Sequence, residues 1–418
     1  MIDLIWLSDS VNSSTINSIL VIATTVVVLI GVFHPRVVNS VIWRGTVTPL
    51  ASIIGSGFLV LAPILKHSFG VWGIGVMAAL CAGAYAIGGA IRFNIARYGH
   101  YEQQRLAVPK LVSRLEVVAS YLLVAAYGIS ITYYLNLFGA FSVSLTAVDD
   151  RPHGRLVTTG VIALITLIGW VRGFSGLERA EEATVGLKLG IIAGLLMGLL
   201  AFAFEQLRSD GGVYFSNGHR MNWQSIAVAM GLIVTVQGFE TSRYLGDEFD
   251  VPTRIRTMRI AQWLSTAIYL LYIALTTFFF SDEQVGNSET AIVGMTQLVA
   301  PVLPVMLVAA ALAAQFSAAV ADTAGCGGLA QETTHHKLNA RVTYVLVGVF
   351  GIGLTWLADI YAIIAIASRA FAAYYAIQCA IAAAFEARTD APRRLRVVGF
   401  LALAIAAAII VVFGRSVE

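Results

Sequence analysis

Charged residues are scarce in this sequence of 418 residues. Asp, Glu, Lys and Arg together make up 12% of the chain, whereas hydrophobic residues make up 58%. A typical soluble domain carries about 25% charged residues. Because so few charges cannot cover a globule of this size with a hydrated surface, the composition argues against a soluble enzyme and indicates that lipid surrounds most of the protein.

Several chemical signatures are also missing. The three cysteines, Cys81, Cys326 and Cys379, lie in apolar stretches without metal-ligand spacing, so we expect neither a disulfide framework nor a zinc site. The net charge is only +3 and no basic tail is present, which argues against nucleic acid as a partner. No phosphate-binding loop and no nucleophile–base spacing occur, so we predict no nucleotide cofactor and no enzymatic activity. The adjacent pair His335 and His336 is a weak metal candidate, since neighbouring residues face different sides of a helix.

Long apolar runs dominate the chain instead. A helix needs about 20 mostly apolar residues to cross a bilayer. Such stretches are found at 16–33, 47–65, 71–93, 115–143, 156–171, 183–207, 223–245, 258–280, 302–325, 342–357, 360–385 and 397–413. The sequence therefore predicts an all-α integral membrane protein with about 12 transmembrane helices.

The positions of Lys and Arg predict the orientation. Residues 1–15 contain two aspartates and no Lys or Arg, so the first stretch does not look like a cleavable signal peptide and is expected to remain as a helix. Most Lys and Arg residues fall in alternate loops, with clusters at 92–114, 254–259 and 388–396. By the positive-inside rule these loops are cytoplasmic, which places both termini outside a cytoplasmic (inner) membrane.

Two of the predicted spans are interrupted near mid-depth. The second contains Ile54-Gly55-Ser56-Gly57-Phe58, and the seventh contains Gln237-Gly238-Phe239-Glu240-Thr241. Irregular backbone at membrane depth occurs where it lines a cavity or is buried in protein, and paired breaks are typical of transporter binding sites. The alternative is that the glycines only allow close helix packing.

Each interrupted span opens a set of five. The sets cover 47–207 and 223–386, with an extracellular loop at 208–222 between them. Because five is odd, the second set enters the membrane from the opposite side, which predicts an inverted repeat. Residues 1–46 then supply an extra N-terminal helix and loop, and 387–418 supply an extra C-terminal helix.

These motifs carry a resemblance to a known family. The Ile54–Phe58 segment resembles the broken first core helix of the amino acid–polyamine–organocation (APC) superfamily. Gly238-Phe239-Glu240, followed by Gly246-Asp247-Glu248 and Pro252-Thr253-Arg254, resembles that family's sixth core helix and its cytoplasmic exit. The resemblance implies the LeuT-like five-plus-five inverted-repeat fold of amino acid permeases, here with one extra helix at each end.

Lys188 and Glu240 are candidates for carrying a coupling proton. Lys188 lies several residues inside the sixth span, where a charge is costly unless it is paired, hydrated or extended to the membrane surface. The resemblance implies that a lysine at this place in the fifth core helix occupies the position of a sodium ion. Glu240 follows the second break, where a carboxylate binds an amine, titrates, or accepts hydrogen bonds from the frayed backbone. In some family members this position has a gating or pH-sensing role.

Other polar side chains lie within the spans. Arg369 is about ten residues into the eleventh span, near mid-membrane at 1.5 Å per residue, and needs a partner such as Glu240, a substrate carboxylate or backbone carbonyls. Tyr127 and Gln315 suit either a cavity or contacts between helices. Asp322 lies near the cytoplasmic end of its span and is interpreted as a helix-end charge.

The sequence therefore favours a secondary transporter for a small amino acid or organic amine. It works by alternating access and is expected to be proton-coupled and sodium-independent. We predict a carboxylate site at the first break and an ammonium site at the second, with Phe239 covering the substrate. The predicted substrate-binding residues are Ile54, Gly55, Ser56, Gly57, Gln237, Gly238, Phe239, Glu240, Tyr127, Gln315 and Arg369. The alternatives are an inorganic-ion transporter of the same fold and a non-transporting membrane sensor or scaffold subunit.

Overall fold

The computed structural model describes residues 2–55, 57–173, 178–209, 212–215, 221–286, 288–389 and 391–417, with side chains of 2–13 and 178–183 excepted. Within these residues all regular structure is helical. The long helices are α1 (Ile2–Val32), α3 (Val41–Ile53), α4 (Gly57–Phe69), α5 (Gly73–Gln103), α6 (Lys110–Val143), α7 (Arg151–Val171), α8 (Glu178–Arg208), α10 (Val251–Phe279), α12 (Leu303–Thr333), α13 (Ala340–Leu357), α14 (Ile360–Glu386) and α15 (Arg394–Phe413). The shorter ones include α9 (Trp223–Met230), η2 (Ile233–Val236), η3 (Phe239–Tyr244) and α11 (Ala291–Gln297).

The prediction of about 12 membrane helices is confirmed. Ten segments of the described chain are long and apolar enough to cross a membrane, and one of them, Gly57–Gln103, has 47 residues and contains both α4 and α5. The crossing made by α9, η2 and η3 is too interrupted to qualify by length, although it connects the same two sides. Not predicted was α11, which lies in the connection between α10 and α12.

The two sides of the molecule differ in charge. The basic face is the side on which α6, α10, α13 and α15 begin, and the first turns of these helices contain Lys110, Arg254, Arg341 and Arg394. The other side is the opposite face. Asp150, Asp250 and Asp359 accept hydrogen bonds from the first turns of α7, α10 and α14, which explains where those helices begin.

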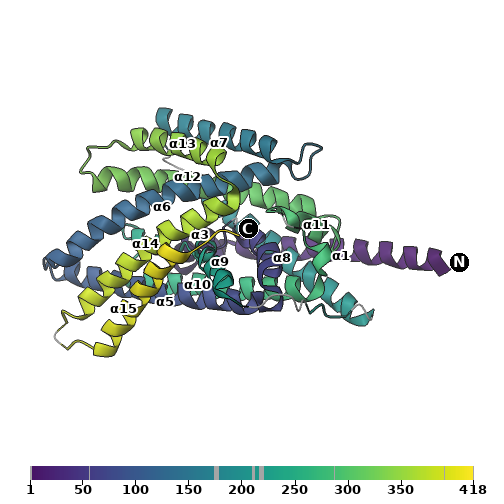
Figure 1. Ribbon diagram of the computed structural model, residues 1–418, viewed down its shortest axis with the longest axis horizontal. Helices are drawn as coiled ribbons and strands as arrows, with labels where there is room; N and C mark the ends of the chain where they lie inside the picture. The colour runs from purple at the N-terminus through teal and green to yellow at the C-terminus, as the bar shows by residue number, and fades with distance from the viewer. Residues whose placement is uncertain are drawn as a thin grey trace.

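The helices form two groups joined by α8 and α14. In one group α3, α4, α5 and η3 pack around α10, whereas in the other α6, α7, α12 and α13 pack against one another. Figure 1 shows the second group along the upper edge of the view, with α5, α10, α14 and α15 below it. Each broken crossing is thus the first of five, and the two sets of five run in opposite directions, as the sequence predicts.

The extra N-terminal helix is attached through a row of glycines. Gly186, Gly190, Gly194 and Gly198 recur every fourth residue on α8, and α1 lies against them. A Cβ atom at Gly194 would lie 2.2 Å from Thr25 Oγ1 and 2.9 Å from the carbonyl oxygen of Val21. Such a small-residue face lets two membrane helices approach closely. At the other end of the chain α15 packs along α14 in a similar way.

Substituting Gly194 with Val is expected to weaken the α1–α8 contact. The new side chain must displace the α1 backbone, and overpacking of this kind costs about 1–3 kcal/mol. Thermal unfolding of the detergent-purified variant should therefore show a lowered Tm. Gly83→Val is the matched control, because a Cβ atom there would meet no other heavy atom within 4 Å. Equal Tm values for both variants would contradict the glycine contact.

Candidate substrate-binding site

The first break separates α3 from α4. The α-helix ends at Ile53, Ile54 adopts φ −83° and ψ 55°, and α4 begins at Gly57. Ser56 lies outside the described residues. Ile54 is fully buried, and the N–H of Phe58 donates to the carbonyl oxygen of Gly55 at 3.3 Å. The chain therefore turns at mid-depth between two half-helices, where the first N–H groups of α4 lack intrahelical partners.

The second break is longer than the sequence indicates. The α-helix stops at Met230, and the chain continues to Tyr244 only in the 3-10 segments η2 and η3. Gly238 adopts φ +116°, a conformation that side chains strongly disfavour. A Cβ atom at Gly238 would also lie 2.5 Å from the carbonyl carbon of Ser52 in α3. Only glycine therefore allows the two breaks to touch.

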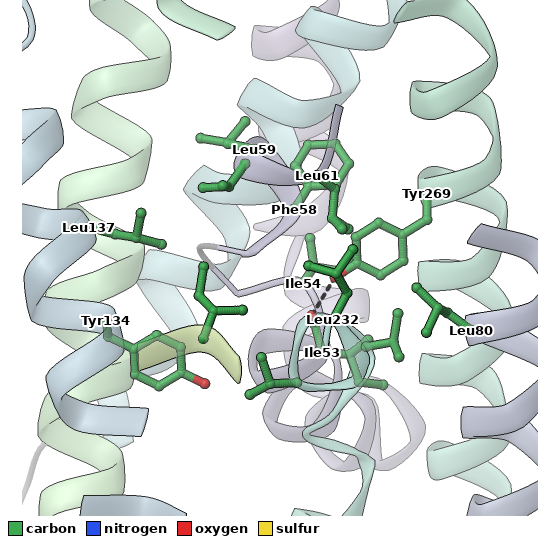
Figure 2. Packing of buried hydrophobic residues seen from close by; sticks show 14 of the residues in the cluster. Ile53, Ile54, Phe58, Leu59, Leu61, Leu80, Tyr134, Leu137, Leu232 and Tyr269 are labelled. Atoms are coloured by element: carbon green, nitrogen blue, oxygen red, sulfur yellow. Dashed lines mark hydrogen bonds between the residues drawn. The ribbon is translucent and has the colours of Figure 1, made fainter. Parts of the chain in front are cut away.

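Tyr269 of α10 joins the two breaks. Its hydroxyl lies 2.6 Å from the carbonyl oxygen of Ile53 and 2.8 Å from that of Thr235, so it donates to the backbone of one break or the other. Figure 2 shows Tyr269 and Phe58 side by side next to this point, with their ring centroids 5.6 Å apart. The hydroxyl satisfies carbonyls that the broken helices leave without helical partners.

Glu240 supports the second break from behind. Its Oε2 accepts hydrogen bonds from the N–H of Gly238 at 2.9 Å and from the hydroxyl of Tyr375 at 2.8 Å. The ring of Phe239 stacks on that of Tyr375, with centroids 5.2 Å apart. Both Phe239 and Glu240 are buried. In this conformation Glu240 thus has the structural contacts that were one of its three predicted roles.

Two buried amides near the breaks have free hydrogen-bonding capacity. Gln237 donates to the hydroxyl of Tyr134 at 3.2 Å, but its Oε1 has no partner among the described residues. Neither polar atom of the Gln315 amide has one either, although the side chain is fully buried. In Figure 2 the hydroxyl of Tyr134 points toward the Ile53–Ile54 region. Buried amides without partners are costly, so these groups are suited to a polar ligand.

A cavity of about 780 Å³ begins at the breaks and extends toward the basic face. Its walls come from α3, α6, α8, η3 and α12. Polar lining residues are Thr48, Ser52, Tyr127, Thr184, Lys188, Thr241, Tyr244, Ser317, Asp322 and Glu332. Because Ser52 lies next to the first break and Glu332 lies in the last turn of α12, the cavity connects mid-depth with the basic face.

Lys188 crosses from α8 to the first break. Its Nζ donates to the carbonyl oxygen of Ala51 in the last turn of α3 at 2.9 Å, and the side chain is only 7% exposed. It also lines the cavity. The ammonium is thus directed toward the break and not toward the membrane surface, contrary to the alternative in which the side chain extends to the lipid headgroups.

Asp322 is a cavity residue that the sequence interpretation missed. It lies 11 residues before the end of α12, about 16 Å from that end at 1.5 Å per residue, and its carboxylate accepts a hydrogen bond from Ser130 of α6. It was assigned to the helix end because the predicted span stopped at residue 325, whereas α12 continues to Thr333. A carboxylate within the alanine-rich segment 318–324 is the signal that identifies it.

Arg369 lies elsewhere than expected. Its Nε donates to the carbonyl oxygen of Gly414 at 2.8 Å, its side chain is exposed, and it does not line the cavity. The reason is its face of α14, which is turned toward the C-terminal segment after α15. That segment returns to α9, where the N–H of Arg415 donates to the carbonyl oxygen of Ala227. Of the three partners considered for Arg369, the structure thus provides a backbone carbonyl.

Polar contacts tie η3 to three other helices near the basic face. Arg243 forms an ion pair with Glu116 of α6 at 2.7 Å and hydrogen-bonds to Gln378 of α14. The hydroxyl of Tyr98 in α5 donates to Glu116 at 3.1 Å, and the Arg243 guanidinium lies 4.8 Å from the Tyr98 ring centroid. These contacts join η3 to α6, so the cavity opens on the other side of η3, between α3, α8 and α12.

Three of the predicted residues therefore surround the break without lining the cavity, and others line it. Gln237, Gly238 and Gln315 are buried beside it. Tyr127 and Lys188 face it directly. A ligand that moves from the cavity into the region between the breaks would meet both sets.

Comparisons of sequence and structure agree with this geometry. A family model described as an APC superfamily transporter matches residues 35–414. An uncharacterised protein of Aquifex aeolicus (strain VF5) is 38% identical over 415 residues, which cover 98% of this chain and 100% of that protein.

Solved transporter structures share the fold at low sequence identity. MhsT in complex with L-phenylalanine matches with a TM-score of 0.58 at 16% identity, over 89% of this chain and 98% of that one. Mhp1, a nucleobase-cation-symport-1 family transporter, matches with a TM-score of 0.55 at 14% identity, over 88% and 92% of the two chains. A Na⁺-coupled sialic acid symporter matches with a TM-score of 0.53 at 12% identity, over 96% and 98%. With two inverted sets of five helices and a family match over nearly its whole length, this chain belongs to the APC superfamily of transporters.

Proposed function

We propose that this transporter carries a small amino acid or organic amine by alternating access, with proton coupling and without sodium. The observation that carries the proposal is the position of the Lys188 ammonium, 2.9 Å from a carbonyl oxygen at the first break and on the wall of the cavity. A fixed ammonium at a broken half-helix takes the place in which a transported cation would otherwise bind carbonyl oxygens.

The two breaks supply complementary binding groups. The N-terminus of α4 presents N–H groups and the positive end of a helix dipole, which favour a carboxylate. The carbonyl groups around Gly238 and the free Oε1 of Gln237 favour an ammonium. We propose Gly55, Ser56, Gly57, Gln237, Gly238 and Gln315 as the substrate-contacting residues, with Phe239 closing the site.

The cavity supports an inward-facing state. We propose that the basic face is cytoplasmic in an inner membrane, which follows from the distribution of Lys and Arg. The cavity then opens to the cytoplasm, and both termini lie outside. Residues 47–207 and 223–386 act as the two inverted repeats that exchange roles during the cycle.

Flux measurements test the proposal. Purified protein in proteoliposomes should take up labelled amino acids or amines, and an inward proton gradient should accelerate the uptake. No flux of any amine, amino acid or divalent cation would favour a sensor or scaffold role. Flux restricted to an inorganic cation would favour the ion-transporter alternative.

Replacing sodium with choline is expected to leave uptake unchanged. A second cation beside the Lys188 ammonium is repelled at short range, so no sodium ion should be required. The measurement is the initial rate of uptake at constant ionic strength across a range of sodium concentrations. A steep rise of the rate with sodium would reject the role assigned to Lys188.

A further inference from the structure

Two carboxylates lie at membrane depth near the breaks, and they differ in access. Glu240 is fully buried, is hydrogen-bonded to Gly238 and Tyr375, and does not line the cavity. Asp322 does line the cavity, and one of its oxygens accepts a hydrogen bond from Ser130. A ligand that enters the cavity in this conformation therefore meets Asp322 and not Glu240.

A second polar group faces the same place. Tyr127 is only 8% exposed and lines the cavity, and its hydroxyl makes no hydrogen bond within the described part of the chain. Tyr127 is one helical turn from Ser130 on α6, and its ring lies 3.7 Å from the Cβ position of Gly325, one turn from Asp322 on α12. The carboxylate and the tyrosine hydroxyl thus lie together at the α6–α12 contact, and both are able to accept a hydrogen bond from a ligand.

Resting on the proposed function above, we propose that Asp322 and Tyr127 bind a second, positively charged amino group of the substrate. The transported molecule is then a cationic amino acid or a diamine, and not a neutral amino acid. One end of it binds at the breaks, and its distal ammonium binds at Asp322.

The shape of the cavity supports this assignment. Between Ser52 at the first break and Asp322, the α12 wall consists largely of small apolar residues, Ala313, Ala314, Ala318 and Ala321. These leave room for an aliphatic chain that joins two polar ends. The volume of about 780 Å³ also exceeds what a small neutral amino acid fills.

Charge complementarity supports it as well. A carboxylate that loses its water when the site closes needs a counter-charge, because an unpaired buried charge is costly. A substrate ammonium supplies that charge and is released when the cavity hydrates again. Lys188 on α8 remains available for the substrate carboxylate, so the two walls bind groups of opposite sign.

The test compares charged probes with uncharged analogues of similar shape. Uptake of L-lysine and L-arginine into proteoliposomes is measured against L-norleucine and L-citrulline, with putrescine as the diamine. We expect the parent to prefer the charged probes, and Asp322→Asn to reduce the charged-to-neutral ratio of kcat/KM by at least about tenfold, equivalent to about 1.4 kcal/mol. Tyr127→Phe should reduce the ratio in the same direction by less.

Glu332→Gln is the matched control, since Glu332 lines the same cavity at its mouth and the change removes the same charge. It should leave the ratio close to that of the parent. A parent that transports norleucine as well as lysine, or an unchanged ratio in Asp322→Asn, overturns the assignment while the proposed function stands. Parent protein that moves none of the probes refutes the proposed function itself.

Loss of all transport in Asp322→Asn is resolved by binding. The shift in Tm of purified protein with L-lysine and with L-norleucine then measures binding without turnover. Selective loss of the lysine shift supports the assignment. Equal loss of both shifts, together with an unchanged ratio in Tyr127→Phe, overturns it.

Discussion

Replacing Lys188 with Met or Arg is expected to abolish the acceleration of uptake by an inward proton gradient while substrate binding persists. In the structure Nζ donates to the carbonyl oxygen of Ala51 at the C-terminal end of the half-helix α3. That end carries a partial negative charge, which stabilises an ammonium there. When α3 moves relative to α8 the contact must change, so the proton on Lys188 biases the two conformations.

The two substitutions separate charge from bulk. Met keeps much of the stem without a titratable group, whereas Arg keeps the charge at every useful pH, so neither should couple. Lys110→Met is the control, because Lys110 is exposed at the start of α6. The measurement is the pH profile of uptake for the parent and the three variants. If the profiles of the parent, Lys188→Met and Lys188→Arg superimpose, Lys188 carries no coupling proton.

The fold was largely predictable because membrane helices are local in sequence. Their length follows from the bilayer, and the order of five and five follows from counting. The second break was only partly predicted. Gly238 signals it, but the segment Leu232–Val236 is apolar and resembles an ordinary membrane helix, although the structure holds it as a 3-10 turn through tertiary contacts such as Tyr269 with Thr235.

The candidate site was harder to predict because depth and facing are different properties. Counting residues gives the depth of Arg369, but its face of α14 depends on where the C-terminal segment lies, and that contact joins residues 45 apart in sequence. Lys188 was found because a charge inside an apolar span is a local signal. The contact between Asp322 and Ser130, 192 residues apart, has no such signal in a single sequence.

Gly57→Val is expected to remove substrate binding while the protein still inserts. A Cβ atom at Gly57 would lie 2.7 Å from the Tyr133 hydroxyl and 3.2 Å from the side chain of Thr235, so the larger side chain forces the two breaks apart. Overpacking costs about 1–3 kcal/mol, which lowers stability without preventing folding. The N–H groups at the start of α4 are displaced, and each hydrogen bond lost to a charged ligand costs about 1.5–3 kcal/mol.

Substrate affinity should therefore fall by roughly 10- to 100-fold or more, as measured by ligand-induced shifts in Tm of the purified variant. Gly160→Val in α7 is the control, because a Cβ atom there would meet no other heavy atom within 4 Å. The smaller Gly57→Ala should lie between the parent and Gly57→Val, since it adds only the atom that contacts Tyr133 and Thr235. Near-native affinity in a well-folded Gly57→Val protein would remove the first break from the substrate site, and the glycine would then serve only the contact between the two broken crossings.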